Sequence, residues 1–168
     1  MTLETARLRI RQLTPDDAAF ILTLLNDPGF LRYIGDKGVR SLEDARQYIE
    51  HGPRASYARH GFGLNAVEPI DGGDPVGICG ILKRDELDAP DLGFAFLPLA
   101  RGQGLAREAA SAILDDAWAR LGVTRMLAIT QPENYASVTL LERLGFRFDR
   151  MVRLAPEGHD LRLFSRAL

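Results

Sequence analysis

The chain has 168 residues, enough to bury one substantial hydrophobic core, whereas two domains sharing this length would each be marginal. Hydrophobic residues make up 46% of the chain and charged residues 26%, which are the proportions of an ordinary soluble globular protein. The formal net charge of −2 creates no overall field that would attract nucleic acid or an anionic membrane, so we expect neither as a partner.

The sequence carries no signal for export, membrane insertion or disulfide crosslinking. The N-terminal segment MTLETARLRI lacks the apolar run of a signal peptide, and no stretch approaches the roughly 20 apolar residues of a membrane span. Cys79 is the single cysteine, so an intrachain disulfide is excluded. These features favour a cytoplasmic location. No linker or repeat interrupts the chain, and we expect one domain over residues 1–168.

Hydrophobic periodicity predicts an α/β fold. Alternation of apolar and polar residues indicates strands, and apolar residues spaced three and four apart indicate helices. The expected strands cover residues 7–13, 62–67, 76–82, 92–97, 124–130, 146–152 and 160–168. The expected helices cover residues 15–26, 42–51, 104–121 and 134–144.

Capping residues and glycines mark the expected helix ends. Thr14 and Ser41 stand where side chains can cap the first two helices. NDPG at 26–29 and Gly52 with Pro53 are expected to end them, which leaves the segments 26–40 and 52–61 as loops.

The element order predicts a mixed, mostly antiparallel sheet. The strands at 62–67, 76–82 and 92–97 form an antiparallel meander, with a DGGD turn in its first hairpin. The helix at 104–121 is a crossover, so the strand at 124–130 is expected to lie parallel to 92–97. The resulting order is β-α-α-β-β-β-α-β-α-β-β.

The segment PLARGQGLAREA at 98–109 joins a strand to the longest helix. Unpaired N–H groups at a helix start attract anions, and Gly102 and Gly104 allow a ligand close to the backbone. Arg107 falls in the first helical turn, where a bound anion would offset the unfavourable cation, and Arg101 can add a second charge. The segment is neither a full dinucleotide fingerprint nor a P-loop. Local sequence alone leaves a tight turn and a diphosphate cradle as alternatives.

Several further segments are informative together with this one, and in chain order they span nearly the whole sequence. They are ETARLRIRQLTPDDA at 4–18, VGICGI at 76–81, LGFAFLPLARGQGLAREA at 92–109, NYASVTLLERLGF at 134–146 and HDLRLFSRAL at 159–168. Arg101, Gly104 and Ala106 fit the motif Arg/Gln-x-x-Gly-x-Gly/Ala, and Asn134 and Ser137 fit Asn-x-x-Ser. The combination resembles the GCN5-related N-acetyltransferases (GNAT), and within them the RimJ/RimL-like branch that acetylates ribosomal-protein N-termini.

The resemblance implies a GNAT-like sheet and acetyl-CoA as cosubstrate, without a metal. In that family the strands matching 92–97 and 124–130 splay apart, and the pantetheine arm bonds the open edge of the first strand. The pyrophosphate lies on backbone amides at the helix start, and the asparagine bonds pantetheine from the other wall. The cofactor-binding residues implied here are Phe96, Leu97, Arg101, Gly102, Gln103, Gly104, Leu105, Ala106 and Asn134.

The resemblance also implies direct attack of a neutral amine on the acetyl thioester. Ser137 is expected to protonate or hydrogen-bond the departing sulfur, and Leu141 stands where other branches carry a tyrosine. The alternative for Ser137 is a local bond to backbone in the first helical turn. The general base is open, because Asp91, Glu133, Glu157 and Asp160 each read as solvated or turn carboxylates. A weak base or water suffices for an α-amine with a pKa of about 8, which favours an N-terminal or other low-pKa amine as acceptor.

Other chemically notable residues receive structural interpretations. Cys79 reads as a small core residue, Trp118 as a packing residue on its helix, and KRDELDAPD at 83–91 as a solvated connection. His51, His60 and His159 lack metal-ligand spacing and read as surface or turn residues, so no metal site is expected.

The sequence therefore predicts an acetyl-CoA-dependent N-acetyltransferase. Its amine acceptor is a protein N-terminus or a small molecule, with a protein N-terminal α-amine as one candidate. A non-catalytic acyl-CoA-binding or sensing module is the alternative from another functional class. The acceptor, the choice between acetyl and another short acyl group, and the choice between monomer and homodimer stay open.

Overall fold

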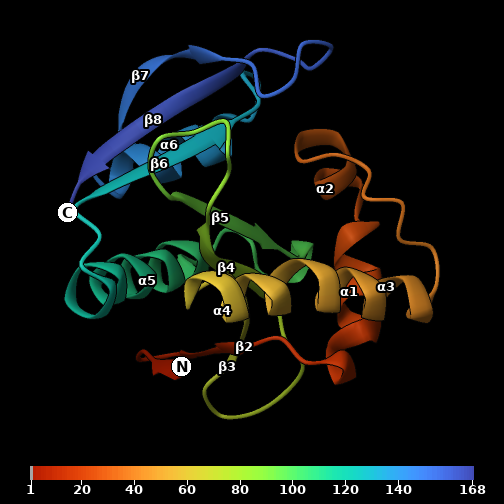
Figure 1. The fold of residues 1–168 in the computed structure, drawn as a ribbon. Helices are drawn as coiled ribbons and strands as arrows, with labels where there is room; N and C mark the ends of the chain where they lie inside the picture. Colours follow the sequence, from red (N-terminus) through yellow and green to blue (C-terminus); the bar gives the residue numbers. More distant parts are fainter. Residues whose placement is uncertain (1) are drawn as a thin grey trace.

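Eight strands form one mixed sheet in the computed structural model, which describes residues 2–168 (Figure 1). Their spatial order is β1-β2-β3-β4-β5-β6-β8-β7, and every neighbouring pair is antiparallel except β5–β6. The strands are β1 (Thr2–Glu4), β2 (Leu8–Gln12), β3 (Leu64–Pro69), β4 (Gly77–Leu82), β5 (Asp91–Phe96), β6 (Arg125–Thr130), β7 (Arg147–Val152) and β8 (Leu161–Ala167). The predicted mixed fold, its meander and its parallel pair are confirmed.

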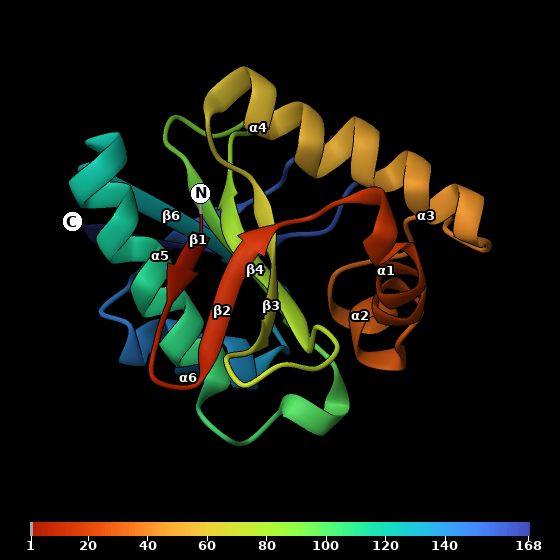
Figure 2. The same ribbon diagram turned by 90° about the horizontal axis from the view of Figure 1, so that it is seen from below.

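Helices cover both faces of this sheet (Figure 2). They are α1 (Ala18–Leu25), α2 (Pro28–Tyr33), α3 (Leu42–Ile49), α4 (Ala55–His60), α5 (Leu105–Leu121) and α6 (Tyr135–Arg143). The hydrophobic core on one face is shared by α5, α6 and the sheet, and that on the other face by α1, α2, α3 and the sheet. None of these helices is long and apolar enough to cross a membrane.

Three elements differ from the sequence prediction. β1 is three residues long, too short to show a period of two. α2 lies in the expected 26–40 loop, because Asp27, which follows α1 closely, caps a new helix by accepting bonds from the N–H groups of Gly29 and Phe30. Gly52 and Pro53 do not end the second helix. The chain widens there into a π-helical turn, Glu50–Arg54, and continues into α4.

β5 and β6 separate almost as soon as they meet. Their register holds one partner pair, Asp91 with Leu127, and the Leu127 N–H donates to the Pro90 carbonyl at 2.9 Å. Toward their C-terminal ends the two strands share no further pair. The expected splayed parallel pair is therefore present, and it leaves one edge of β5 open.

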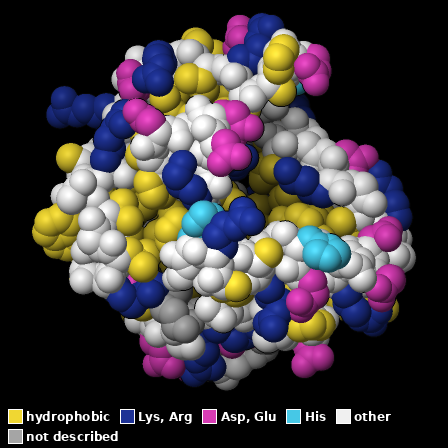
Figure 3. All heavy atoms as spheres, in the orientation of Figure 1, with side chains coloured by type: hydrophobic (Ala, Val, Ile, Leu, Met, Phe, Trp, Pro, Cys, Tyr) yellow, Lys and Arg dark blue, Asp and Glu magenta, His cyan; other side chains and the backbone are white. Residues whose placement is uncertain are grey.

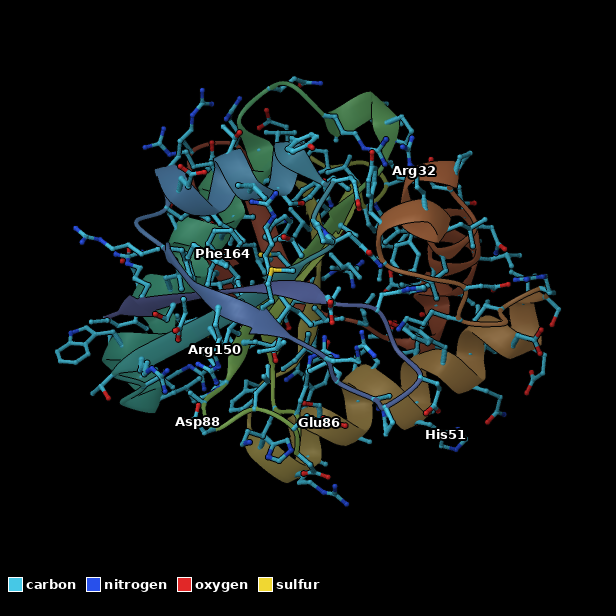
Figure 4. The ribbon with its side chains drawn as sticks, turned by 90° about the horizontal axis from the view of Figure 1, so that it is seen from above. Arg32, His51, Glu86, Asp88, Arg150 and Phe164 are labelled. Atoms are coloured by element: carbon cyan, nitrogen blue, oxygen red, sulfur yellow. The ribbon has the colours of Figure 1, made fainter. Side chains whose placement is uncertain are left out.

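The connection between β4 and β5 is partly buried, which corrects the prediction of a solvated loop. Leu87 and Ala89 pack with Leu127 and Leu163 in a small third cluster. Glu86 and Asp88 alternate with them and lie at the periphery of the molecule (Figure 4). Leu87 and Ala89 therefore cover the far side of β6, while Asp85, Glu86 and Asp88 face water.

The prediction for Trp118 is wrong and that for Cys79 is confirmed. Trp118 is 55% exposed, because it lies off the buried stripe of α5, which consists of Ala109, Ala110, Ile113, Leu114 and Ala117. Cys79 is fully buried in β4, and this burial raises the pKa of its thiol to about 12. A thiol with that pKa is protonated at neutral pH and is no nucleophile.

An ion pair fixes the corner between β2 and α1. Arg11 donates from Nη1 and Nη2 to the two carboxylate oxygens of Asp17, each at 2.9 Å, and the Thr14 N–H donates to the same carboxylate at 2.9 Å. Asp17 is buried, and burial opposes its ionisation. The bonds from Arg11 and Thr14 outweigh this opposition and lower the pKa of the carboxyl.

We expect Asp17→Asn to lower the free energy of unfolding at neutral pH by about 1–3 kcal/mol, because it removes charge-assisted bonds at a buried site. A lowered folded pKa contributes stability above the ordinary value of 3.8, and this contribution disappears as the pH falls through the folded value. Urea denaturation of the wild type and the variant should thus show a difference in the free energy of unfolding that shrinks below about pH 4. Asp16→Asn, at the exposed neighbouring position, serves as the control; an equal loss in both variants would contradict the assignment.

Candidate active site

A cleft of about 1180 Å³ opens where β5 and β6 diverge. Its walls come from α2, the start of α5, α6 and the β7–β8 loop, and its floor comes from β4 and β5. On the face seen in Figure 3 the recess between the β7–β8 region and α2 shows apolar side chains inside and Lys and Arg side chains at its rim.

Side-chain alternation along β5 divides the cleft into two halves. Leu92, Phe94 and Phe96 point to the α5 face, where they join the core of that face. Ala95 points to the opposite face with the α1–α3 core, and by alternation Asp91 shares that side. All five residues line the same cleft, so the gap between β5 and β6 connects the two faces of the sheet.

The same alternation leaves backbone groups of β5 free at the gap. The Leu97 N–H donates to Val76 on the β4 side, and the Pro90 carbonyl accepts from β6. Successive backbone groups in a strand point to opposite edges, so those of Phe94 and Phe96 face the gap. An extended ligand arm can add there as a strand would.

The loop before α5 presents a row of unpaired amides. Among residues 2–168, no hydrogen bond engages the N–H groups of residues 102–107. Gly102 and Gly104 have φ of +75° and +77°, a left-handed conformation that turns successive amides toward one concave side. Arg107 lines the cleft and is exposed in the first turn of α5. Such an arrangement is suited to an anion, and the helix dipole would add to the attraction.

Arg101 fastens this loop to α2 and to β5. Its Nε donates to the Phe96 carbonyl at 3.1 Å, and its Nη2 donates to the Asp27 carboxylate at 2.7 Å. Asp27 is the buried N-cap of α2. The Arg101 side chain therefore connects the loop before α5 to both β5 and α2.

The β1–β2 hairpin holds the other side of the loop. Arg7 donates from Nη1 to the Gln103 carbonyl at 3.0 Å and from Nε to Glu108 at 2.7 Å. Thr5 also donates to Glu108 at 2.5 Å. Partial burial opposes ionisation of Glu108, but these bonds lower the pKa of its carboxyl below the usual range. The amide row is therefore positioned before any ligand arrives.

Asn134 and Ser137 form the opposite wall. Asn134 caps α6, its Oδ1 accepting from the Ser137 N–H at 3.3 Å. Within the described residues, Asn134 Nδ2 and Ser137 Oγ have no hydrogen-bond partner, and both residues line the cleft. Thr130, at the end of β6, also lines it; its Oγ1 is buried and unpaired in this part of the chain.

The structure brings most of the predicted site residues together. Those that line the cleft are Phe96, Arg101, Gly102, Gly104, Leu105, Ala106, Asn134 and Ser137. Leu97 and Gln103 are not part of the lining. Both backbone groups of Leu97 are engaged, by Val76 and by Ala100. Since the Phe96 carbonyl accepts from Arg101, the open edge consists of the backbone groups of Phe94 and the N–H of Phe96.

One of the four candidate base carboxylates is buried, which corrects its interpretation as a solvated group. Asp91 is 1% exposed and lines the cleft, and Arg84 Nε donates to its two oxygens at 3.2 and 3.1 Å. Burial raises the pKa of Asp91, against the opposing effect of Arg84. Glu133 and Glu157 are exposed as expected, and Asp160 is exposed and pairs with Arg153 at 3.0 Å.

Sequence analysis missed further residues of the cleft. They are Lys37, Tyr48, Arg84, Thr130 and His159. None belongs to a motif, and a tertiary fold is needed to bring them to one cavity. His159 is exposed at the cleft, whereas His51 points outward from the junction of α3 and α4 (Figure 4). In residues 2–168 no cluster of His, Cys, Asp and Glu has the geometry to hold a metal ion.

Comparison with known proteins agrees with this geometry. A family described as Acetyltransferase (GNAT) domain matches residues 7–147. An uncharacterized N-acetyltransferase, YoaA of Bacillus subtilis (strain 168), is 28% identical over 153 residues, covering 90% of this chain and 85% of YoaA.

Two solved structures share the fold. A GNAT-family acetyltransferase from Bacillus anthracis has 25% identity and a TM-score of 0.82, with 99% of this chain and 98% of that chain covered. RimL, a ribosomal L7/L12 α-N-protein acetyltransferase solved with coenzyme A, has 15% identity and a TM-score of 0.79, covering 100% and 98%. The fold, the cleft and the match over residues 7–147 show that this chain belongs to the GNAT family and is an acetyl-CoA-dependent acyltransferase.

Proposed function

We propose that this chain transfers the acetyl group of acetyl-CoA to a primary amine by direct attack on the thioester. The observation that carries the proposal is the row of unpaired amides at residues 102–107, which opens into a cleft reaching both faces of the sheet. A cofactor on the α5 face and an acceptor on the α1–α4 face can then meet in the gap between β5 and β6. Direct transfer needs such a meeting point, because both substrates must be present together.

The pyrophosphate and the pantetheine arm of acetyl-CoA each have matching groups in the cleft. The amides of residues 102–106 bind the pyrophosphate, and Arg107 adds positive charge. Arg101, whose charge is paired with Asp27, instead holds the loop in place. The pantetheine arm bonds the open edge at Phe94 and Phe96, and the free Nδ2 of Asn134 reaches it from the opposite wall. The thioester is thereby aligned along the gap, which lowers the entropic part of the barrier.

Ser137 supplies the proton or hydrogen bond that the departing thiolate needs. Its hydroxyl has no partner among residues 2–168, which favours this role over a local bond to backbone. Asp91 is engaged by Arg84, so we assign removal of the amine proton to water. An α-amine, with its pKa of about 8, is deprotonated in part at neutral pH and suits this mechanism.

The acceptor is a small-molecule amine or a protein N-terminus, and residues 1–168 act as one catalytic domain. RimL, whose name describes N-terminal acetylation, shares the fold at 15% identity, so its substrate is a candidate to test. The alternative of a non-catalytic acyl-CoA-binding module is less favoured, because the chain keeps Asn134 and an unengaged Ser137 in the cleft.

Calorimetry should detect acetyl-CoA binding with a Kd on the order of micromolar. Free thiol should then appear when acetyl-CoA is mixed with at least one amine from a panel of N-terminal peptides, polyamines and aminoglycosides. Absence of binding would overturn the cofactor assignment. Binding of acetyl-CoA without thiol release for any amine would contradict the proposal that an amine accepts the acetyl group. It would favour the non-catalytic binding module.

Gly104→Ala should raise the Kd for acetyl-CoA by about tenfold or more, because a side chain at φ +77° strains the loop and reorients its amides. Gly122→Ala is the matched control: it has φ +66° at the other end of α5, where a Cβ meets no atom within 4 Å. Both variants should lose about 1 kcal/mol of stability. Equal acetyl-CoA affinities in the two variants would argue against the amide cradle.

Ser137→Ala should lower kcat by about 100-fold and leave the acetyl-CoA Kd unchanged, since the hydroxyl acts on the leaving thiolate. Ser111→Ala, on the exposed side of α5, should keep the wild-type kcat. Steady-state kinetics over a range of pH, with titration calorimetry for the Kd, measures both quantities. Wild-type kcat in Ser137→Ala at every pH would remove Ser137 from the mechanism.

A further inference from the structure

The acceptor half of the cleft contains two cations that the acetyl-transfer scheme does not use. Lys37 lies in the segment after α2, and Arg84 lies in the connection before β5; both line the cleft. Within the described residues, Lys37 Nζ forms no hydrogen bond or ion pair, and Arg84 uses only Nε among its side-chain donors.

A buried carboxylate aims the Arg84 guanidinium. Asp91 is 1% exposed at the point where β5 meets β6, and its two oxygens share the Arg84 Nε. Because Nε is held there, the Nη groups remain available to another partner. A guanidinium fixed in this way loses little freedom when it binds a planar anion through its remaining N–H groups.

Lys37 and Arg84 are close enough to affect each other. Lys37 is exposed at the cleft mouth, yet the surrounding protein lowers the pKa of its amine, and the positive charge of Arg84 adds to this effect. Like charges held together are unfavourable unless a counter-ion joins them. Tyr48 lines the same half of the cleft, and its hydroxyl has no hydrogen-bond partner in residues 2–168, so a third donor is available there.

The charges in this half match a monoanion. Two cations and the single carboxylate of Asp91 leave one unit of positive charge. A carboxylate balances this charge, whereas a phosphate group carries about −1.5 to −2 and exceeds it. The Arg84 fork also suits the two oxygens of a carboxylate.

We propose that the acceptor amine carries a carboxylate, which binds between Lys37 Nζ and the Nη groups of Arg84, with the Tyr48 hydroxyl as a further donor. This inference rests on the proposed amine acetylation and names its substrate class. The carboxylate belongs to a free amino acid or to an acidic residue near a peptide N-terminus. The anion would anchor the acceptor on the α1–α4 face while its amine enters the gap.

Matched acceptor pairs test the inference on the full chain. Free amino acids are compared with their α-amides, and short peptides beginning with Asp or Glu are compared with those beginning with Asn or Gln. The carboxylate member of at least one pair should have a kcat/KM about tenfold higher, because it forms charge-assisted bonds. The pair that shows the preference identifies the source of the carboxylate. Phosphoethanolamine against ethanolamine is the third arm, and a preference confined to phosphate would overturn the assignment.

Variants at Lys37 connect the preference to the site. Lys37→Gln should reduce the carboxylate-to-amide ratio of kcat/KM toward one, and Lys37→Arg should restore it. Arg59→Gln is the control: it removes an exposed cation on α4 that does not line the cleft and forms no side-chain hydrogen bond or ion pair among residues 2–168, and it should keep the wild-type ratio.

Two results would overturn the inference. The first is a wild-type ratio near one for every pair. The second is a Lys37→Gln variant that keeps the wild-type ratio. In either case acetylation of neutral amines would leave the proposed function intact. Failure to acetylate any member of the panel would instead contradict the proposed function itself.

Discussion

The divergence of β5 and β6 is the constraint on which the rest of this structure depends. A parallel pair that stayed in register would close the sheet and bury the backbone of both strands. Here the pair stops after Asp91 and Leu127. The backbone groups of Phe94 and the N–H of Phe96 stay open to a ligand, while the Phe96 carbonyl accepts from Arg101. Unpaired backbone groups are costly when buried, so the cleft at this edge has to be polar, hydrated or filled. The proposed acetyl-transfer site and the break in strand pairing are thus the same feature.

The contacts around the gap hold it open from three directions. Arg101 connects the loop before α5 to Phe96 and to the N-cap of α2. Arg7, which bonds Gln103 and Glu108, connects the same loop and the start of α5 to the N-terminal hairpin. The buried apolar residues of the 83–91 connection support β6 from the far side. A cradle for a diphosphate costs little reorganisation when its amides are already aimed, and this rigidity serves binding as well as chemistry.

The two halves of the cleft differ in the groups that they offer to the proposed substrates. The α5 face presents backbone amides and an open strand edge, groups that every residue type supplies and that suit an invariant cofactor. The α1–α4 face presents the side chains of Lys37, Tyr48 and Arg84, which vary readily with sequence and suit a specific acceptor. Under the proposed function, cofactor recognition would rest mainly on backbone groups, and acceptor recognition on side chains of segments outside the sheet.

The sequence by itself determined the order of the main elements, the glycine-rich start of α5, and the family. These features are local: periodicity, caps and glycines depend on residues within one or two turns of each other, and the motif at Arg101, Gly104 and Ala106 lies within six residues. Only the tertiary structure decided that α2 and α4 are helices, that Trp118 is exposed, and that Asp91 is buried beside Arg84. It also decided which residues of the predicted loop join the cofactor cleft and placed Lys37 on the acceptor side. Burial and charge pairing are set by partners distant along the chain, as Arg101 and Asp27 are, and no local pattern records such a contact.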